Sequence, residues 1–455
     1  MAKNNLMGEI KTNLIEPVRN WLADFEKAIS LSDFKSAKML FLRDSYWRDL
    51  LAFTWHIQTI NGAKNIVEAL EIFAKNTKPS NFKIDLHRTP PRLVTRAGTE
   101  VIEAIFAFET AFGHANGVLR LNSGNHNDDT LKAWTLLTAL DEIKGFEECA
   151  ADARPMGKSY SRDFHGPNWF DDRQSAVAYA DREPTVLVVG GGQAGLSIAA
   201  RLTQLNVDTL IVDREQRVGD NWRNRYHALS LHNQVHVNHL PYMPFPQNWP
   251  TYIPKDKLAG WFETYTDCME LNFWTETEFS GGTYNEQTSK WSVMLNLAGE
   301  KSREIHPHHI VMATGVSGIP NLPNITGLES FVGKIIHSSE YDNGSNWLDK
   351  NVLIIGTGTS GHDIAQDLFS NGANVTLVQR SPTMIVNVEP SAQLPYALYD
   401  EGLPLEDCDL IASSMPFQLM RTSHQLITEK IKVLDKELLD GLSRVGFRID
   451  FGKDN

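Results

Sequence analysis

The stretch "PTVLVVGGGQAGLSIAARLTQLNVDTLIVDRE", residues 184–215, decides the fold of the middle of the chain. It contains an apolar run, then a glycine-rich loop, a helix-forming segment and a second apolar run that ends in Asp213. This order predicts a strand, a loop, a helix and a second strand parallel to the first. Repeated units of this kind build α/β folds around a parallel sheet.

Three spaced glycines give this first loop the pattern of a pyrophosphate-binding turn. Gly190 permits the tight turn, Gly192 lets backbone approach a pyrophosphate, and Gly195 allows close packing of helix and strand. Backbone N–H groups at the start of the helix then face the phosphate charge. Asp213, roughly twenty residues on, can accept a hydrogen bond from a ribose hydroxyl. The expected contacts with an adenine dinucleotide are Gly190, Gly192, Gln193, Ala194, Gly195 and Asp213.

A second copy of the unit follows in "KNVLIIGTGTSGHDIAQDLFSNGANVTLVQRSP", residues 350–382. Its second strand ends in Arg380, where the first copy has an acid. A guanidinium can pair with the phosphate on the ribose 2′ position, whereas a carboxylate would repel that phosphate. The second loop therefore predicts NADPH, although a strand-end arginine can also be a solvated surface charge. The expected contacts are Gly356, Gly358, Thr359, Ser360, Gly361, Arg380 and Ser381.

Composition and charge exclude several classes of protein. The apolar share of 42% and the charged share of 22% are those of an ordinary globular protein. No apolar run reaches the ~18 residues of a membrane span. The net charge of −13 argues against a nucleic-acid partner. A homo-oligomer is possible. The start lacks a targeting pattern and the three cysteines are far apart, so we expect a reducing, cytoplasmic location.

Residues 1–150 predict a separate α+β unit. The segment "EPVRNWLADFEKAIS", residues 16–30, has apolar residues at helical spacing, and strand-like runs such as "EVIEAIFAFET" follow. Helices first and a curved sheet afterwards resembles the NTF2/SnoaL-like cone. His56 is a possible ligand or base there, but a packed or partly exposed histidine is the more ordinary interpretation. Residues 151–183 are polar and predict a linker.

Between the two loops the chain resembles the flavin-containing monooxygenases, most closely their plant YUCCA-like and fungal members. The matching features are Gly219, Trp222, "RYHALSLH" (residues 225–232), "LPYMPFP" (residues 240–246) and "PTYIPKDKLAGWFETY" (residues 250–265). The resemblance implies that the first loop binds FAD. It places Trp222 and the segment through His232 and Asn238 beside the flavin, although Trp222 can equally be a core aromatic. Further FAD contacts implied by the resemblance are Arg214, Ala313, Thr314 and Gly315.

The most family-specific short motif is "FVGKIIHSSEY", residues 331–341. Phe331, Gly333, His337 and Tyr341 match the family pattern F-x-G-x-x-x-H-x-x-x-[WYF]. By this resemblance His337 organises the domain interface near the nicotinamide, and Tyr341 favours heteroatom-oxidising or YUCCA-like members over Baeyer–Villiger enzymes. The candidate catalytic residues are His337, Tyr341 and Asn238. The alternative is that Phe331 and Tyr341 are packing residues and His337 a buried hydrogen-bond donor.

The resemblance also implies a reaction. NADPH reduces FAD, the reduced flavin adds oxygen to form a C4a-(hydro)peroxide, and one oxygen atom passes to a small organic substrate. No metal is required. A pyridine-nucleotide disulfide reductase, which also binds two nucleotides, needs a cysteine pair that the three separated cysteines do not provide. Among amines, thioethers, 2-oxo acids and ketones, the sequence does not select a substrate.

The fold expected from these features is α/β, with two Rossmann-type domains preceded by the α+β cone. Residues 184–345 are expected to form the first part of the FAD domain. Residues 346–455 are expected to form an incomplete NADPH domain with a helical extension. Family members continue beyond this point to complete both domains, so we expect a truncated chain. The alternative function is therefore an inactive flavoprotein fragment that acts at most as a binding module.

Overall fold

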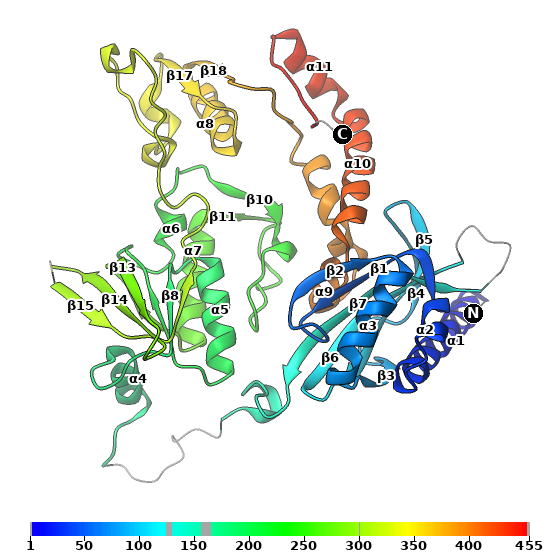
Figure 1. Ribbon diagram of the computed structural model, residues 1–455. Helices are drawn as coiled ribbons and strands as arrows, with labels where there is room; N and C mark the ends of the chain where they lie inside the picture. Colours follow the sequence, from blue (N-terminus) through cyan, green and yellow to red (C-terminus); the bar gives the residue numbers. More distant parts are fainter. Residues whose placement is uncertain (1, 124–129, 156–164, 300, 453–455) are drawn as a thin grey trace. The chain divides into compact units, whose positions relative to one another are not determined.

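The computed structural model describes residues 2–123, 130–155, 165–299 and 301–452. The chain divides into two compact units (Figure 1). Unit 1 contains residues 1–147, 385–441 and 451–455, and unit 2 contains residues 148–384 and 442–450. The sequence placed residues 346–455 in one domain, whereas the structure returns residues 385–441 to the N-terminal unit. Within the described residues, no helix is long and apolar enough to span a membrane.

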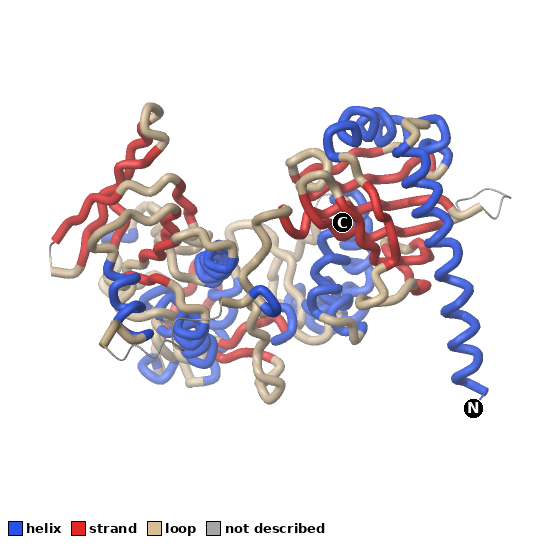
Figure 2. The backbone as a smooth tube through the Cα atoms, turned by 90° about the horizontal axis from the view of Figure 1, so that it is seen from below, coloured by secondary structure: helices blue, strands red, loops and turns tan. Residues whose placement is uncertain are grey.

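Unit 1 is built on one mixed sheet with the strand order β2-β1-β7-β6-β5-β3, and β4 also pairs with β5. Strands β1 and β7 are parallel, and the other pairs are antiparallel. Figure 2 shows these strands side by side with the long N-terminal helix α1 alongside them. The elements are α1 (Ala2–Ser30), α2 (Phe34–Met39), β1 (Phe41–Leu50), β2 (Ile57–Asn61), α3 (Ala63–Thr77), β3 (Ser80–Ile84), β4 (Arg92–Arg96), β5 (Thr99–Glu109), β6 (Gly113–Asn122), β7 (Lys132–Ile143), η7 (Ser391–Glu401), α9 (Leu405–Ser413), α10 (Phe417–Leu434) and α11 (Lys436–Arg444), which begins in this unit.

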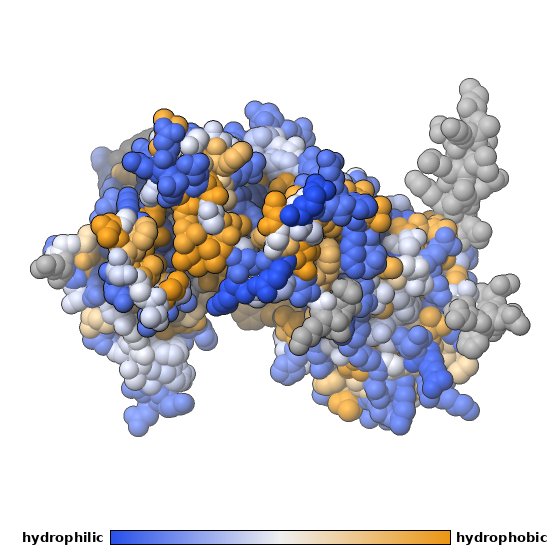
Figure 3. Space-filling model, turned by 90° about the horizontal axis from the view of Figure 1, so that it is seen from above, coloured by the Kyte–Doolittle hydropathy of each residue, from blue (hydrophilic) through white to orange (hydrophobic). Residues whose placement is uncertain are grey.

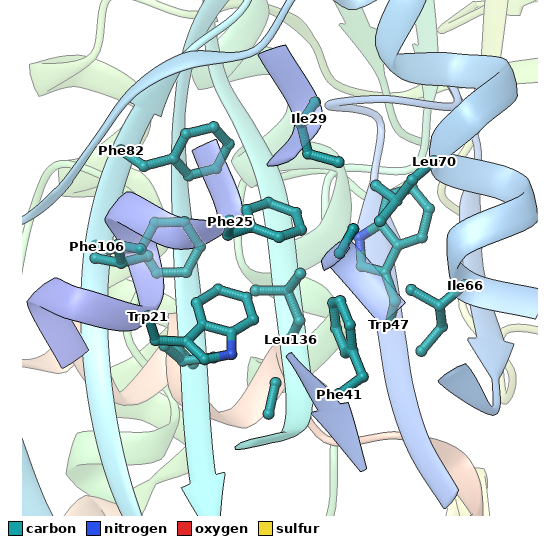
Figure 4. Packing of buried hydrophobic residues seen from close by; sticks show 14 of the residues in the cluster. Trp21, Phe25, Ile29, Phe41, Trp47, Ile66, Leu70, Phe82, Phe106 and Leu136 are labelled. Carbon is teal, nitrogen blue, oxygen red and sulfur yellow. The ribbon is translucent and has the colours of Figure 1, made fainter. Parts of the chain in front are cut away.

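Both faces of this sheet are buried. Phe106 of β5 packs with Trp21 and Phe25 of α1 in the larger core (Figure 4). The next residue back, Ile105, points to the opposite face and packs with Ile411 of α9. The helical spacing in residues 16–30 therefore predicts the α1 face correctly. The sheet agrees with the expected α+β class, while a closed NTF2-like cone stays a prediction.

A charged cluster is buried on the face of the sheet that α9 covers. Glu103 of β5 accepts from Arg120 Nε at 2.9 Å, from Arg96 Nη2 at 2.9 Å and from Arg92 Nη2 at 2.7 Å. Burial opposes the ionisation of Glu103, but the hydrogen bond from Arg96 and the positive charges of the three arginines outweigh it. They lower the pKa of this carboxyl to about 2.

Unit 2 contains a parallel sheet with the order β12-β9-β8-β16, which confirms the predicted strand–loop–helix–strand unit. An antiparallel sheet, β13-β14-β15, follows β12, and a two-stranded parallel sheet, β17-β18, carries the second loop. The elements are α4 (Trp169–Ala178), β8 (Val186–Val189), α5 (Gln193–Gln204), β9 (Thr209–Val212), α6 (Asp220–Arg223), β10 (Ser230–Gln234), β11 (Tyr252–Pro254), α7 (Lys255–Cys268), β12 (Asn272–Trp274), β13 (Thr277–Asn285), β14 (Lys290–Leu297), β15 (Lys301–Ile305), β16 (His309–Met312), β17 (Asn351–Ile355), α8 (Thr359–Ser370) and β18 (Asn374–Val378), with short 3₁₀ turns η1 (Ala151–Ala153), η3 (Val235–Val237), η4 (Leu328–Ser330), η5 (Ser338–Glu340) and η6 (Gly344–Trp347).

The predicted linker, residues 151–183, ends in structure that belongs to unit 2. Helix α4 begins with a capping box between Asn168 and Asp171. Tyr179 after it is buried and donates to Asp208 at 2.6 Å. The polar composition is that of an exposed helix as well as of a linker, so this helix was missed. Residues 156–164 of the predicted linker lie outside the described part.

Within the described part of the chain, the β17-β18 sheet is covered on one face and exposed on the other. Helix α8 lies against these strands through Ile364 and Leu368, which pack with Val352, Ile354 and Val375. The alternate side chains face away from α8, and Leu353 and Ile355 are 59% and 52% exposed. Parallel sheets are normally covered on both faces. Figure 3, which is coloured by hydropathy, shows exposed apolar residues as orange areas on one face of the protein.

We predict that Glu103→Gln destabilises unit 1 at neutral pH, because three buried guanidiniums lose their common carboxylate. Since the folded pKa is depressed from 4.5 to about 2, the wild-type carboxylate contributes stability above pH 4.5 that is lost as the pH falls toward 2. That contribution, on the order of 3 kcal/mol, should be absent in the variant.

Urea titrations followed by hydrogen exchange of β5 peptides measure the free energy of unfolding of unit 1 across this pH range. The control is Glu100→Gln, an exposed acid on the same strand. An identical pH dependence in Glu103→Gln and wild type would contradict the assignment.

Candidate functional site

The first loop connects β8 to α5 through backbone contacts too close for any side chain. Gly190 has φ +106°, and a Cβ there would lie 2.5 Å from the carbonyl oxygen of Ala313. A Cβ on Gly195 would overlap the carbonyl oxygen of Gly190. Gly192 is the N-cap of α5, and no described side chain caps this helix end. Helix α5 begins at Gln193, which Ala194 follows. The N–H groups of this first turn are thus available to an anion.

Asp213 lies at the end of β9 beside the loop. Its Oδ2 accepts from the Gly191 N–H at 2.6 Å, and its Oδ1 accepts from the Glu215 N–H at 3.0 Å. A carboxylate oxygen has a second lone pair, so Asp213 can also accept from a ribose hydroxyl. The structure therefore fits the predicted position and adds a second role, fixing the loop. The adjacent Arg214 is exposed and donates to the Gly318 carbonyl at 2.7 Å.

The residues implied beside the flavin occupy different environments. Trp222 packs partly buried against the unit 2 core, and its Nε1 is buried without an acceptor in the described part of the chain. Asn238 donates to the carbonyl oxygens of Asn233 and Gln234, at 3.2 and 2.9 Å, and so fixes its own turn. Ala313 donates its N–H to Val189 at 2.8 Å. Thr314 and Gly315 follow it and are exposed.

The second loop repeats the geometry of the first. Gly356 has φ +118°, and a Cβ on Gly361 would lie 2.7 Å from the Gly356 carbonyl oxygen. Gly358 is the N-cap of α8, again without a described side-chain cap. Thr359 and Ser360 form the first turn of that helix. The backbone arrangement thus fits the predicted second anion site, although a Cβ on Gly356 would meet nothing within 4 Å, unlike a Cβ on Gly190.

Arg380 lies at the end of β18 and is exposed. Next to it lies Arg448, which the sequence did not indicate. Arg448 exchanges backbone hydrogen bonds with the Gln379 side chain, at 2.7 and 2.9 Å, and its Nη2 donates to the Arg380 carbonyl at 3.1 Å. Thr383 forms a parallel bridge with Ile449. Two guanidinium side chains thus leave the same strand end, with the exposed Ser381 beside them.

Two tyrosines attach α8 to the segments before it. Tyr226 donates to Asp363 and Tyr341 donates to Asp367, each at 2.6 Å. Asp363 and Asp367 are one helical turn apart on α8. Burial, with the acceptor carboxylate, raises the pKa of both hydroxyls above the ordinary value. Tyr341 is therefore held as a buried hydrogen-bond donor, which is the packing interpretation of this position.

His232 of β10 contacts the helix that follows the second loop. Its Nε2 lies 3.4 Å from Oδ2 of Asp363, in the first turns of α8. His337, in contrast, caps η5 by accepting from the Ser339 N–H at 3.1 Å, and it is partly buried. Phe331 is exposed. The structure thus brings His232 and Tyr341 to α8 through separate carboxylates, and leaves His337 and Asn238 in local turn contacts.

The central part of the chain is similar to known proteins. Residues 187–398 match the family model described as pyridine nucleotide-disulphide oxidoreductase. The chain is 34% identical over 209 residues to the probable indole-3-pyruvate monooxygenase YUCCA10 of Arabidopsis thaliana, covering 46% of this chain and 55% of that protein. It is 30% identical over 204 residues to the indole-3-pyruvate monooxygenase YUCCA1 of Oryza sativa subsp. japonica, covering 45% and 49%. The chain spans about half the length of the curated relatives it matches.

Among solved structures, a flavin-containing monooxygenase from Stenotrophomonas maltophilia aligns with 23% identity and a TM-score of 0.41, covering 50% of this chain and 67% of that chain. The resemblance seen in the sequence is confirmed by the curated relatives. The matching family model carries the name of disulfide chemistry, but Cys149, Cys268 and Cys408 are all unpaired thiols.

We predict that Gly195→Ala destabilises unit 2 by about 2 kcal/mol or more, because the new methyl group overlaps the Gly190 carbonyl. The matched control is Gly260→Ala in α7, where a Cβ meets nothing within 4 Å. Alanine there should stabilise its helix by up to about 1 kcal/mol. Urea unfolding of both variants measures the difference. Equal effects would show that helix propensity alone governs the two positions.

Proposed function

We propose that this chain, which is similar over about half of its length to probable indole-3-pyruvate monooxygenases, is an NADPH- and O2-dependent flavin monooxygenase of a small organic substrate. The observation that carries the proposal is the pair of glycine loops, one ending in the Asp213 carboxylate and the other in the Arg380 guanidinium. His232 of β10 lies 3.4 Å from Asp363 of α8, the helix that follows the second loop. Hydride transfer requires that the two bound coenzymes lie close together.

The first loop fits the diphosphate of FAD. Gly190 and Gly195 leave room that a side chain would fill, and the uncapped start of α5 presents N–H groups to an anion. Asp213 would bind a ribose hydroxyl with its remaining lone pairs. Trp222 Nε1 has no described acceptor, so it is a donor that a flavin carbonyl could satisfy.

The second loop fits NADPH. The start of α8 would bind the diphosphate, and Arg380 with Arg448 would pair with the 2′-phosphate. When both coenzymes are bound, they supply hydride transfer and the activation of oxygen. We propose that Tyr226 and Tyr341 position α8 for this step through Asp363 and Asp367, while no described contact gives His337 or Asn238 a proton-transfer role.

Three further points remain proposals. The names of the relatives above refer to indole-3-pyruvate, whereas for this chain we propose only a small organic substrate without choosing its reacting atom. A reducing, cytoplasmic compartment is proposed from the three unpaired cysteines. A nucleic-acid partner is disfavoured by the net charge of −13.

One observation favours a second candidate, a flavoprotein fragment without activity. Leu353 and Ile355 of β17 expose apolar side chains on the face of the β17-β18 sheet that α8 does not cover. Large exposed apolar surfaces mark contact sites or unstable regions. Purified full-length protein distinguishes the candidates. Yellow flavin absorbance with substrate-stimulated NADPH oxidation supports the monooxygenase, and a colourless protein that oxidises no NADPH supports the fragment.

We predict that Arg380→Gln weakens the binding of 2′,5′-ADP by about tenfold, because one charge-assisted contact with the 2′-phosphate is lost. Arg448→Gln should have a similar effect, since its structural bonds to Gln379 use backbone atoms that the substitution keeps. Titration calorimetry with 2′,5′-ADP and 5′-AMP measures the change without any requirement for flavin.

Arg444→Gln, an exposed arginine on α11, is the control for total charge. The affinity for 5′-AMP should stay the same in all variants, because this ligand lacks the 2′-phosphate. Wild-type protein that binds the two ligands equally would refute NADPH preference at the second loop.

A further inference from the structure

Unit 1 contains a second charged arrangement that the proposed reaction does not use. Glu401, at the end of η7, approaches two arginines of β4. Arg96 contacts both carboxylate oxygens, with Nη1 to Oε1 at 2.7 Å and Nη2 to Oε2 at 3.1 Å. Arg92 Nη1 lies 2.6 Å from Oε2. Two guanidiniums therefore surround one carboxylate, and Arg96 binds it with two parallel bonds.

The charges behind this contact require an anion at the position of Glu401. Arg92, Arg96 and Arg120 share one buried carboxylate, that of Glu103. Without Glu401 the buried cluster would carry three positive charges and one negative charge. The Nε of Arg92 is also buried, and it has no acceptor among the described residues. Buried charge without a partner is strongly unfavourable, and the Glu401 carboxylate reduces the excess from two positive charges to one.

Glu401 is also charged in this environment. Burial disfavours its ionised form, but the hydrogen bond and charge of Arg96 and the contacts of Arg92 outweigh burial and lower the pKa of the carboxyl. Its side chain is 30% exposed, so water and small solutes reach the contact.

The residues after Glu401 dock on the same face of the sheet. Asp407 of α9 binds Arg88 Nε at 2.6 Å and the Thr89 N–H at 2.8 Å. At the other end of α9, Arg48 Nε donates to the Ser413 carbonyl at 2.8 Å. Cations at a helix C-terminus also favour its dipole. The segment from η7 through α9 is thus held by acidic groups and helix-end carbonyls against arginines of unit 1.

We propose that Arg92 and Arg96 form a binding site for a carboxylate group, and that Glu401 is its resident ligand, through which residues 391–413 dock on the sheet formed by the N-terminal part of unit 1. The geometry is that of ligand recognition, because two guanidiniums present several donors to one carboxylate, and the three arginines of the cluster outnumber its carboxylates. Once the Glu401 side chain is shortened, a small free carboxylate fits the space it leaves. This inference is independent of the proposed redox function.

The test is chemical rescue in the full-length chain. Glu401→Ala should lower the melting temperature of unit 1 by about 5 °C, since a partly buried ion pair is lost. Sodium acetate should restore roughly half of that loss relative to sodium chloride at equal ionic strength. Glu406→Ala is the control, because Glu406 is an exposed acid of the same segment. Neither this control nor the wild type should respond specifically to acetate.

Two additional variants make the result specific. Glu401→Gln fills the space without charge, so it should lose stability and gain little from acetate. Adding Arg92→Gln to Glu401→Ala should abolish the rescue, because one of the two guanidiniums is gone. Limited proteolysis of residues 385–441 reports the same changes locally, with faster cleavage in Glu401→Ala and slower cleavage after acetate is added.

An acetate response that is equal in wild type, Glu406→Ala and Glu401→Ala would overturn the proposal, and so would the absence of any response in Glu401→Ala. If Glu401→Ala does not fold in chloride, the yield of folded protein on refolding in acetate is the readout. Recovery in acetate then supports the site, and equal failure in both salts overturns it.

Discussion

The nucleotide-binding geometry of unit 2 depends on backbone groups that approach one another more closely than any side chain would allow. The turn at Gly190 packs under Ala313 of the neighbouring strand end, and Gly195 brings α5 onto the turn itself. This packing fixes the position of the uncapped start of α5 relative to the loop. The bond from the Gly191 N–H holds Asp213 beside the same loop. A single methyl group at Gly195 would separate these elements, so packing and proposed ligand binding share one constraint.

This constraint explains which parts of the site could be predicted from the sequence. The contacts of the first loop join residues that are close in the sequence, such as Gly190, Gly195 and Asp213. Such contacts can be recognised from the spacing of these residues along the chain. Arg448 acts through a strand bridge to a segment 68 residues away, and no spacing rule reaches that far. Tyr341 was predicted as a candidate catalytic residue, whereas in the structure its hydroxyl is held in a hydrogen bond to Asp367. A motif identifies a position but not the partner that fixes its role.

The same reasoning applies to the fold. The apolar periodicity of α1 and the continuous apolar character of β5 were readable, and both agree with a sheet buried on two faces. The sequence did not show what covers the second face, because residues 385–441 follow the second nucleotide loop in the chain. Their helical character was predicted, while their docking on unit 1 depends on ion pairs between distant residues, such as Arg88 with Asp407.

The two sheets with helical partners differ in a way that bears on function. In unit 1, helices cover both faces and the ion pair of Arg88 with Asp407 joins α9 to the rest of the unit, whereas among the described residues β17 and β18 pack against α8 on one face and leave Leu353 and Ile355 exposed on the other. The second loop therefore relies on the hydrogen bonds of Tyr226 and Tyr341 to α8, each worth about 1.5–3 kcal/mol as a bond to a charged group. Tyr226 precedes β10, which carries His232, whereas Tyr341 comes from the segment just before β17. The position of the proposed NADPH site thus depends on two segments of unit 2 that are distant in the sequence and reach the same helix through adjacent turns.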